Sequence, residues 1–311
     1  MTRPWLIIGR TGQVGSALTG LLGQRAFAVD REELDFLKPS DLARGLDRLS
    51  EDKPFSAIVN CAAYNLVDQA ESDRESADAI NHMAPRALAR WCSARRIPLV
   101  HYSTDYVFSG EGSAPWKETD TPSPLSCYGR TKHDGERAVQ ESGCSGYILR
   151  TSWVYDSVHD NFISKMIRLG KTKDTLRVVS DQIGSPTPAS LLAQVTVALL
   201  DSHPDTSNVP NTPSTVSAAE LLHVTPDGET SFFEYAALIF ERARSHGVPL
   251  TITRFEPVKT SDFPTPARRP LNCRLNHEKV KARVAAQISA WPDWRTSVEN
   301  CLEQMDWGRF R

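Results

Sequence analysis

The stretch Trp5-Leu6-Ile7-Ile8-Gly9-Arg10-Thr11-Gly12-Gln13-Val14-Gly15-Ser16-Ala17-Leu18 decides the fold. Its apolar start predicts a short buried strand over residues 5–8, and the apolar positions after Gly15 recur at helical spacing. A strand, a glycine-rich turn and a helix N-terminus together form a phosphate cradle, because the free amides of the first helical turn point at the phosphate. The G-x-x-G-x-x-G spacing is one residue longer than the usual dinucleotide fingerprint, and a tight turn that binds nothing is the alternative.

The second strand, predicted over residues 26–29, ends at Asp30 and Arg31. In dinucleotide-binding folds this strand end faces the adenosine ribose. Asp30 would accept hydrogen bonds from the ribose hydroxyls of NADH, whereas Arg31 would hold the 2′-phosphate of NADPH. The two residues indicate opposite preferences, so either cofactor fits the sequence. Asp35 and Phe36 follow in a loop that would flank the adenine or would simply be a charged surface loop.

Further strands are predicted over residues 57–60, 99–103 and 146–150, alternating with helical patterns. This alternation predicts an α/β protein with a Rossmann-type, doubly wound parallel sheet. We expect a Rossmann domain over residues 1–150, to which segments 174–200 and 218–226 return. Residues 151–311 would form mainly a smaller C-terminal substrate-binding lobe. The third strand runs into Ala62, Ala63 and Tyr64, where small residues leave room for a ligand.

The segment Tyr128-Gly129-Arg130-Thr131-Lys132 lies on a helix predicted over residues 127–141, with Ser126 as its N-cap. Tyr128 and Lys132 are four positions apart and therefore share one helical face. A lysine ammonium beside a phenol favours the phenolate, so we expect Lys132 to lower the pKa of Tyr128 and make it usable for proton transfer. An ordinary exposed pair on an amphipathic helix is the alternative.

Two more segments bring polar groups toward the same region. The fourth strand delivers Thr104, Asp105 and Tyr106 to the carboxyl edge of the sheet, where open α/β sheets bind ligands. Pro85 interrupts a helical pattern, so the main-chain carbonyl of Asn81, four residues earlier, loses its amide partner. That carbonyl would either hold an ordered water or mark a simple kink.

Composition excludes several other classes of protein. The net charge of −2 gives no electrostatic case for nucleic acid or an anionic membrane. The six cysteines are scattered without a metal-ligand spacing, so we predict no metal site, and they fit a reducing, cytoplasmic setting. No segment is long and apolar enough to span a membrane. The stretch Ser202 to Ser217 is rich in Pro, Ser and Thr and is expected to be a surface loop.

Eight stretches, in order, resemble the dTDP-4-dehydrorhamnose reductase family, within the extended short-chain dehydrogenases/reductases. They are GRTGQVG, VNCAAYNLVDQAE, STDYVFSG, YGRTK, LRTSWVY, DQIGSPT, GETSFFEYA and PTPARRPLN. The resemblance implies a Rossmann-type enzyme that uses NADPH or NADH to reduce the C4 keto group of a dTDP-4-dehydro-6-deoxy sugar. It also implies a homodimer as an assembly to consider, although no acidic metal ligands match residue by residue.

The resemblance also implies roles for individual residues. Tyr128 would be the catalytic acid and Lys132 its partner at the nicotinamide ribose, while Thr104 would hydrogen-bond the reacting carbonyl and Asn81 would hold a relay water. The implied pyrophosphate turn comprises Gly9, Gly12, Gln13, Val14 and Gly15. The other implied cofactor contacts are Asp35, Phe36, Ala62, Ala63 and Tyr64. The implied substrate contacts are Thr104, Asp105, Tyr106, Trp153, Arg268 and Arg269, the two arginines being candidates for the pyrophosphate or, alternatively, for loop ion pairs.

Two rival functions fit the same scaffold. A nucleotide-sugar epimerase or 4,6-dehydratase resembles this chain, but dehydratases usually carry an acidic residue where Tyr106 stands. The regulatory subunit of methionine adenosyltransferase also resembles this family and acts as a binding partner instead of an enzyme. The chain keeps Thr104, Tyr128 and Lys132, which favours a catalyst.

Overall fold

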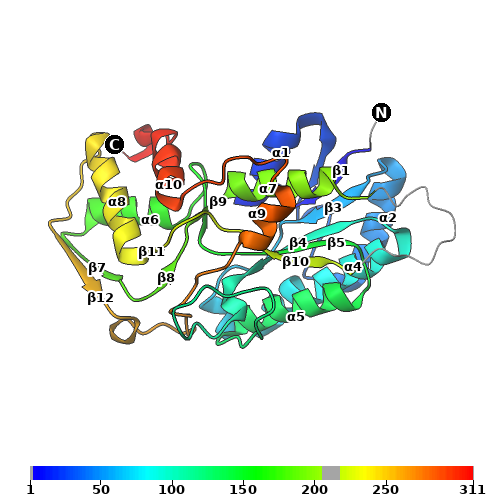
Figure 1. The fold of residues 1–311 in the computed structure, drawn as a ribbon, viewed down its shortest axis with the longest axis horizontal. Helices are drawn as coiled ribbons and strands as arrows, with labels where there is room; N and C mark the ends of the chain where they lie inside the picture. The colour runs from blue at the N-terminus through cyan, green and yellow to red at the C-terminus, as the bar shows by residue number, and fades with distance from the viewer. Residues whose placement is uncertain (1–2, 205–217, 311) are drawn as a thin grey trace.

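The computed structural model describes residues 3–204 and 218–310 (Figure 1). Its larger part is built on a six-stranded parallel sheet, in the order β10-β5-β4-β3-β1-β2. The strands are β1 (Trp5–Ile8), β2 (Ala26–Val29), β3 (Ala57–Asn60), β4 (Leu99–Thr104), β5 (Gly146–Thr151) and β10 (Glu220–His223). The prediction of a Rossmann-type, doubly wound parallel sheet is confirmed.

Helices cover both faces of this sheet, because each central strand is apolar on both sides (Figure 1). Ile7 of β1 packs toward one helical layer, whereas Leu6 and Ile8 pack toward the other. The first layer contains α1 (Gln13–Leu22), α7 (Ala189–Asp201) and α9 (Glu278–Val284). The second layer contains α2 (Leu42–Asp52), α4 (Ala84–Arg95) and α5 (Cys127–Glu141).

The strand order reverses at β1, and this reversal positions the site. From β1 the chain crosses to β2 on one side and then to β3 on the other side. The loops that leave β1 and β3 therefore diverge at the carboxyl edge of the sheet. Open α/β sheets bind ligands at such a switch point.

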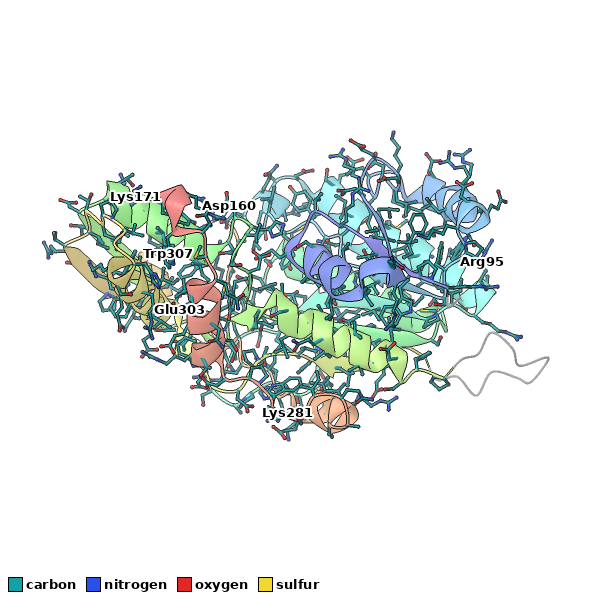
Figure 2. The ribbon with its side chains drawn as sticks, turned by 90° about the horizontal axis from the view of Figure 1, so that it is seen from above. Arg95, Asp160, Lys171, Lys281, Glu303 and Trp307 are labelled. Atoms are coloured by element: carbon teal, nitrogen blue, oxygen red, sulfur yellow. The ribbon has the colours of Figure 1, made fainter. Side chains whose placement is uncertain are left out.

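The smaller lobe has its own apolar core and lies at the other end of the long axis (Figures 1 and 2). In Figure 2, Lys171 of α6 and Arg95 of α4 mark the opposite ends. The helices of this lobe are α6 (Phe162–Thr172), α8 (Phe232–Ser245) and α10 (Trp294–Glu303). Its two-stranded sheets pair β7 (Thr175–Val179) with β12 (Arg254–Val258), β6 (Val154–Tyr155) with β9 (Thr187–Pro188), and β8 (Ile183–Gly184) with β11 (Thr230–Ser231).

The chain passes repeatedly between the two lobes. In segments 174–200 and 218–226, α7 packs on α1 and β10 pairs with β5, both in the Rossmann domain. Residues 175–179 instead form β7, which pairs with β12 in the smaller lobe. From the C-terminal part, α9 packs on the Rossmann core through Val280 and Val284. Most of the loop expected from Ser202 to Ser217 lies outside the described residues.

Short helical turns complete the architecture. Next to α3 (Arg74–Asp78), the π-helix η4 (Ala79–Met83) leads directly into α4. The 3-10 turns are η1 (Gly23–Arg25), η2 (Pro39–Asp41), η3 (Gln69–Glu71), η5 (Asp105–Val107), η6 (Thr260–Asp262) and η7 (Trp307–Phe310). Within the described ranges, no helix has the length and apolar character needed to cross a membrane.

Candidate active site

A pocket opens at the switch point, where β1, β2 and β3 end. Eight of the predicted cofactor-binding residues line it: Gly9, Gly12, Asp30, Arg31, Asp35, Phe36, Ala62 and Ala63. Other lining residues were not predicted, namely Ile8, Thr11, Leu34, Leu37, Cys61, Asn65 and Ile80. Most of these residues are direct neighbours of predicted residues, so their position in the chain is the feature that could have predicted them.

The glycine turn has the close backbone packing that a phosphate cradle needs. Gly9 has φ 89°, a conformation that favours glycine. A Cβ at Gly15 would lie 2.0 Å from the carbonyl oxygen of Gly9, so only glycine lets α1 start this close to the strand end. Val14 packs into the core beneath the turn. Gly15 and Val14 therefore shape the turn from outside the pocket lining.

Two predicted cofactor residues have other partners in the structure. The side-chain amide of Gln13 donates to the main-chain carbonyl of Val154 at 3.2 Å and accepts from the side-chain amide of Asn161 at 3.1 Å. These bonds connect the glycine turn to the smaller lobe. The main-chain amide of Tyr64 donates to the side chain of Asn81 at 2.8 Å, and its hydroxyl donates to Asp73 at 3.0 Å. Neither Gln13 nor Tyr64 lines the pocket, so their contact with a cofactor stays a prediction.

Charges of both signs surround the ribose end of the pocket. Arg10 forms ion pairs with Asp30, at 3.7 Å, and with Glu33, at 3.2 Å. Arg31 lies 3.7 Å from Asp35 and is otherwise largely exposed. Asp30 therefore shares the charge of Arg10 with Glu33, whereas the guanidinium of Arg31 faces solvent at the pocket edge.

Tyr128 lies in the first turn of α5, which the sequence fixes locally. The hydroxyl of Ser126 accepts from the amide of Gly129 at 3.1 Å and caps the helix as predicted. A Cβ at Gly129 would lie 2.3 Å from the carbonyl oxygen of Tyr106, so this glycine lets the helix pack on the loop after β4. The rings of Tyr106 and Tyr128 meet edge to face with their centroids 5.5 Å apart. Tyr128 is only 9% exposed, so it is not a surface residue.

The expected effect of Lys132 on Tyr128 is wrong for this structure. Burial raises the pKa of Tyr128 to about 12, and the side-chain hydrogen bond with Thr104 only partly opposes it. The ammonium of Lys132 donates instead to the main-chain carbonyl of Tyr102, at 2.5 Å. Burial also lowers the pKa of Lys132 itself to about 8. Desolvation, which sequence spacing does not report, is therefore the largest influence on the pKa of Tyr128, and Lys132 is not among the groups that shift it.

Asn81 lies in η4, fully buried between α4 and α5. The chain accommodates Pro85 with a π-helical turn, in which the Ala84 amide donates to the carbonyl of Ala79, five residues back. The side-chain amide of Asn81 donates to the Tyr64 carbonyl and to the Thr131 hydroxyl. Its main-chain carbonyl oxygen faces α5. Asn81 thus sits at a π-bulge, a feature that is frequent at functional sites.

Thr104 and Asp105 lie where β4 ends, beside Tyr128. The Thr104 hydroxyl donates to the Asp105 carboxylate at 3.1 Å and accepts from the amide of Tyr106 at 3.2 Å. Burial raises the pKa of Asp105 to about 6. The Asp105 oxygen Oδ2 is buried and makes no hydrogen bond to any described residue. The pair offers a hydroxyl and a carboxylate to a polar ligand at the edge of the sheet.

Trp153 belongs to the smaller lobe and has an unusual backbone. Its φ is 48°, in the left-handed region that is rare for bulky residues. The indole stacks on Phe232 with ring centroids 3.8 Å apart. A Cβ at Gly184 would lie 3.1 Å from the same indole, so glycine leaves room for the ring. Such strain persists where the surroundings fix it, and it is typical of ligand-binding positions.

The two arginines predicted for the pyrophosphate differ in their surroundings. Arg269 forms a bidentate ion pair with Asp68, at 2.7 and 3.1 Å, and Asp68 also accepts from the Ala267 amide. This is the loop ion pair that the sequence left as the alternative, and it joins the loop after β3 to the C-terminal part. Arg268 is exposed. A role of either residue toward a pyrophosphate stays a prediction.

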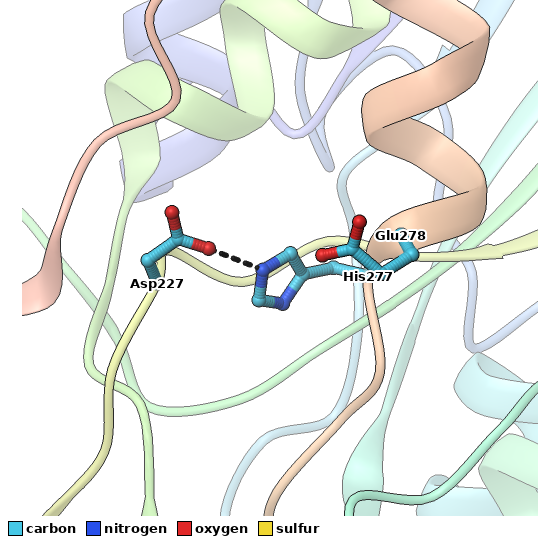
Figure 3. A group of neighbouring side chains, drawn as sticks. All are labelled: Asp227, His277 and Glu278. Atoms are coloured by element: carbon cyan, nitrogen blue, oxygen red, sulfur yellow. Dashed lines mark hydrogen bonds and ion pairs between the residues drawn. The ribbon is translucent and has the colours of Figure 1, made fainter.

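One group of potential metal ligands exists among the described residues, formed by Asp227, His277 and Glu278 (Figure 3). His277 Nε2 lies 2.7 Å from the Asp227 carboxylate. The ammonium of Lys281 lies 3.0 Å from Asp227 and 3.4 Å from Glu278. Because this cation already forms ion pairs with both carboxylates, the group is an ion-pair cluster that fastens α9 to the loop after β10.

The parallel sheet, the glycine turn and the buried Tyr128 with Lys132 on α5 define an extended short-chain dehydrogenase/reductase. Within that class, the chain belongs to the dTDP-4-dehydrorhamnose reductase family, since residues 3–307 match the family described as RmlD substrate binding domain. It is 40% identical to dTDP-4-dehydrorhamnose reductase from Escherichia coli (strain K12), over 96% of this chain and 97% of that protein. It is 37% identical to the enzyme of that name from Burkholderia thailandensis, with 96% and 98% covered.

Solved structures agree with this family. The dTDP-4-dehydrorhamnose reductase from Bacillus anthracis, in complex with NADP, has a TM-score of 0.83 at 31% identity and covers 98% of this chain and 100% of its own. The UDP-glucose 4-epimerase from Brucella ovis, in complex with NAD, has a TM-score of 0.74 at 15% identity, covering 97% and 98%. The second likeness concerns the fold alone.

Proposed function

We propose that this protein reduces the C4 keto group of dTDP-4-dehydro-6-deoxy-L-mannose (dTDP-4-dehydrorhamnose) to dTDP-L-rhamnose, using NADPH or NADH. The observation that carries the proposal is the placement of Tyr128 beside Thr104, at the edge of the sheet next to the nucleotide pocket. The hydroxyls of Tyr128 and Thr104 would then lie together where the C4 carbonyl oxygen of the sugar gains negative charge. The names of the relatives at about 40% identity supply the substrate.

The residues present fit a dinucleotide. Gly9 and Gly12 border the pocket at the start of α1, where main-chain amides favour a pyrophosphate. Asp35 and Phe36 line the same pocket and would hold the adenosine. The bound nicotinamide nucleotide supplies the hydride.

Tyr128 acts as the acid in this account. A phenol with a pKa near 12 remains protonated at neutral pH and donates to the carbonyl oxygen, and the Thr104 hydroxyl would add a second donor by turning its one hydrogen from Asp105 to the ligand. As the carbonyl becomes an alkoxide, its basicity rises above that of the phenol, and the proton moves from Tyr128 Oη to the sugar oxygen. The stabilisation grows with the developing charge, which is the condition for rate acceleration.

Lys132 supports the resulting tyrosinate. Its ammonium is buried on the same helical face, so it stabilises negative charge on Tyr128 more strongly than an exposed lysine would. The hydrogen bond to the Tyr102 carbonyl fixes the side chain against β4. We infer that the same ammonium binds the nicotinamide ribose, as the family resemblance implies.

The sugar would lie between the lobes. Asp105 and Tyr106 approach from the end of β4 and Trp153 from the smaller lobe. The buried carboxylate of Asp105 would accept from sugar hydroxyls, while the Tyr106 and Trp153 rings would cover its apolar faces. Arg268 and Arg269 are the proposed contacts of the nucleotide-sugar pyrophosphate. Assembly of this protein into a homodimer is a proposal that rests on the family alone.

The two rival functions have less support. A dehydratase would use an acidic residue where Tyr106 stands, and Tyr106 carries no carboxylate. A purely regulatory protein has no need of the buried Thr104, Tyr128 and Lys132 together. Epimerases and dehydratases retain NAD through turnover, so purified protein that carries stoichiometric NAD would favour them.

The experiment is an assay of NAD(P)H oxidation with dTDP-, UDP- and GDP-4-keto-6-deoxy sugars. We expect oxidation with the dTDP sugar and its conversion to dTDP-L-rhamnose. Tyr128→Phe is expected to abolish turnover and to bind cofactor nearly as the wild type does, because the hydroxyl is needed for proton transfer and not for the pocket. Wild-type-like reduction by Tyr128→Phe would refute its role. No oxidation with any keto sugar would support the regulatory alternative.

A further inference from the structure

A buried histidine, His101, lies on β4 and faces α5. Its Nδ1 is 3.1 Å from the side-chain amide nitrogen of Asn60, on the neighbouring strand. The oxygen of that amide accepts from the Ala62 amide at 3.1 Å, so the Asn60 nitrogen is the donor toward His101. Nδ1 is therefore an acceptor, and the proton of the neutral ring sits on Nε2.

The Nε2–H group is buried and has no hydrogen-bond partner among the described residues. Gly135 of α5 shows what it faces. A Cβ at Gly135 would lie 2.1 Å from the main-chain carbonyl oxygen of Asn81 and 3.6 Å from His101 Nε2. The two atoms are thus at most about two hydrogen-bond lengths apart. The Nε2–H donor of His101 and the carbonyl acceptor of Asn81 therefore lie near each other beside Gly135, which has no side chain.

The same place lies next to Lys132. Lys132 and Gly135 are three residues apart on α5, and the lysine charge acts on His101. Burial first, and then the charge of Lys132, hold the pKa of His101 well below its usual value, with Glu136 opposing them. His101 therefore remains neutral and keeps one fixed donor.

We propose that His101 is a positioning residue for proton return: its Nε2–H donates to one water molecule that also contacts the Asn81 carbonyl and Lys132. This inference rests on the proposed roles of Tyr128 and Lys132. A water with a donor on one side and an acceptor on the other has the two to four polar partners that buried waters require.

The proton balance is simple. Tyr128 gives its hydroxyl proton to the sugar oxygen, and a proton from the Lys132 ammonium restores the phenol. The water then gives a proton to the neutral lysine, and the resulting hydroxide takes one from solvent. Each transfer breaks one O–H or N–H bond and forms another. His101 exchanges no proton; it orients the water so that a lone pair and a hydrogen face Lys132 and Asn81.

The test compares His101→Phe, which removes the donor, with His101→Gln, which keeps an N–H donor at similar reach. We expect His101→Phe to lower kcat about tenfold, the loss of one hydrogen bond worth about 1.4 kcal/mol, with an increased solvent isotope effect. KM for both substrates should stay within about twofold. His101→Gln should recover most of kcat. His203→Phe, at a partly buried histidine whose Nε2 is also buried and unpartnered among the described residues, is the matched control and should leave kcat unchanged.

Equal losses in the Phe and Gln variants, or a loss that follows cofactor affinity, would overturn the proposal and leave His101 with a packing role. A failure of Tyr128→Phe to lose activity would instead overturn the proposed function, so the two failures are distinguishable. If His101→Phe does not fold, two measurements on the wild-type holoenzyme still test the proposal. Nitrogen NMR should report the neutral Nε2–H tautomer, and a crystal structure should place a water within hydrogen-bonding distance of His101 Nε2 and the Asn81 carbonyl. The other tautomer, or another group at that place, would overturn the proposal.

Discussion

The ammonium of Lys132 donates to the main-chain carbonyl of Tyr102 at 2.5 Å. This bond joins α5 to β4 and leaves Lys132 only 2% exposed. A buried ammonium is costly unless hydrogen bonds satisfy it, so its retention indicates a function at this position. The bond holds the ammonium against β4. Lys132 therefore lies one helical turn from Tyr128 without determining the pKa of Tyr128 in this structure.

Lys132→Ala is expected to weaken NAD(P)H binding and to lower kcat about a hundredfold or more, because the tyrosinate loses its nearby positive charge. Cofactor affinity is measured by fluorescence titration and kcat by single turnover. Lys173→Ala, an exposed lysine in the smaller lobe, is the control and should match the wild type. Unchanged cofactor affinity in Lys132→Ala would contradict a contact with the nicotinamide ribose.

The rate of reduction should depend on the protonation of Lys132. Burial lowers the pKa of Lys132 to about 8, so the ammonium is present below that pH and is lost as the pH rises through it. We expect kcat to be level at neutral pH and to fall above about pH 8. Tyr128, with a pKa of about 12, remains protonated throughout. A pH profile of kcat checks this, and a level profile up to pH 10 would contradict it.

Local patterns predicted most of the fold, and burial accounts for most of what they missed. The glycine turn and the capped helix that begins after Ser126 follow from short-range chemistry, and the helix has the predicted bounds, 127–141. The pKa of Tyr128 depends on surrounding atoms from distant segments, which spacing does not report. The partner of Arg269 is Asp68, far away in the chain, and only the packing of the lobes brings the two together.

The β7 strand shows a second kind of error. Residues 175–179 have the apolar, β-branched character of a strand, and the segment 174–200 that contains them was expected to return to the Rossmann domain. This strand pairs with β12 in the smaller lobe, because the pairing of a strand depends on which other strand lies beside it in the folded chain. Pro85 was expected to free the Asn81 carbonyl or to kink the helix; the chain forms a π-helical turn there, and the Asn81 carbonyl oxygen faces Gly135 of α5.

Glu136→Gln is expected to destabilise the protein by about 3–5 kcal/mol, since it leaves the guanidinium of Arg150 buried without a charge partner. The pair is bidentate, with both distances 2.7 Å. Burial alone would raise the pKa of Glu136, but the bonds from Arg150 and His133 outweigh it and lower the pKa to about 2.

The sign of the pH effect on stability follows from this lowered pKa. The contribution of Glu136 is fully present above its ordinary value of 4.5 and is lost as the pH falls through about 2. Urea unfolding at neutral pH measures the free energy of unfolding. Glu141→Gln, in an exposed pair with Arg137, is the control and should change it by less than about 1 kcal/mol. A similarly small effect for Glu136→Gln would contradict the buried pair.

Arg31→Ala is expected to raise KM for NADPH about tenfold and to leave KM for NADH within about twofold, because only NADPH carries a 2′-phosphate for the guanidinium. The repulsion of that phosphate by Asp30 is reduced by the ion pair of Asp30 with Arg10. Steady-state kinetics with both cofactors measure the effect. Lys38→Ala removes another exposed charge near Asp35 and is the control. Equal changes for both cofactors would place Arg31 away from the 2′-phosphate.

Transfer of deuterium tests the central claim most directly. The protein is incubated with NADPH in which both hydrogens at nicotinamide C4 are deuterium and with dTDP-4-keto-6-deoxy-L-mannose, and the sugar product is analysed by mass spectrometry and NMR. The account predicts one deuterium at C4 of dTDP-L-rhamnose, with equimolar oxidation of the cofactor, and none with Tyr128→Phe. A product without deuterium at C4, or deuterium at C6, would contradict it.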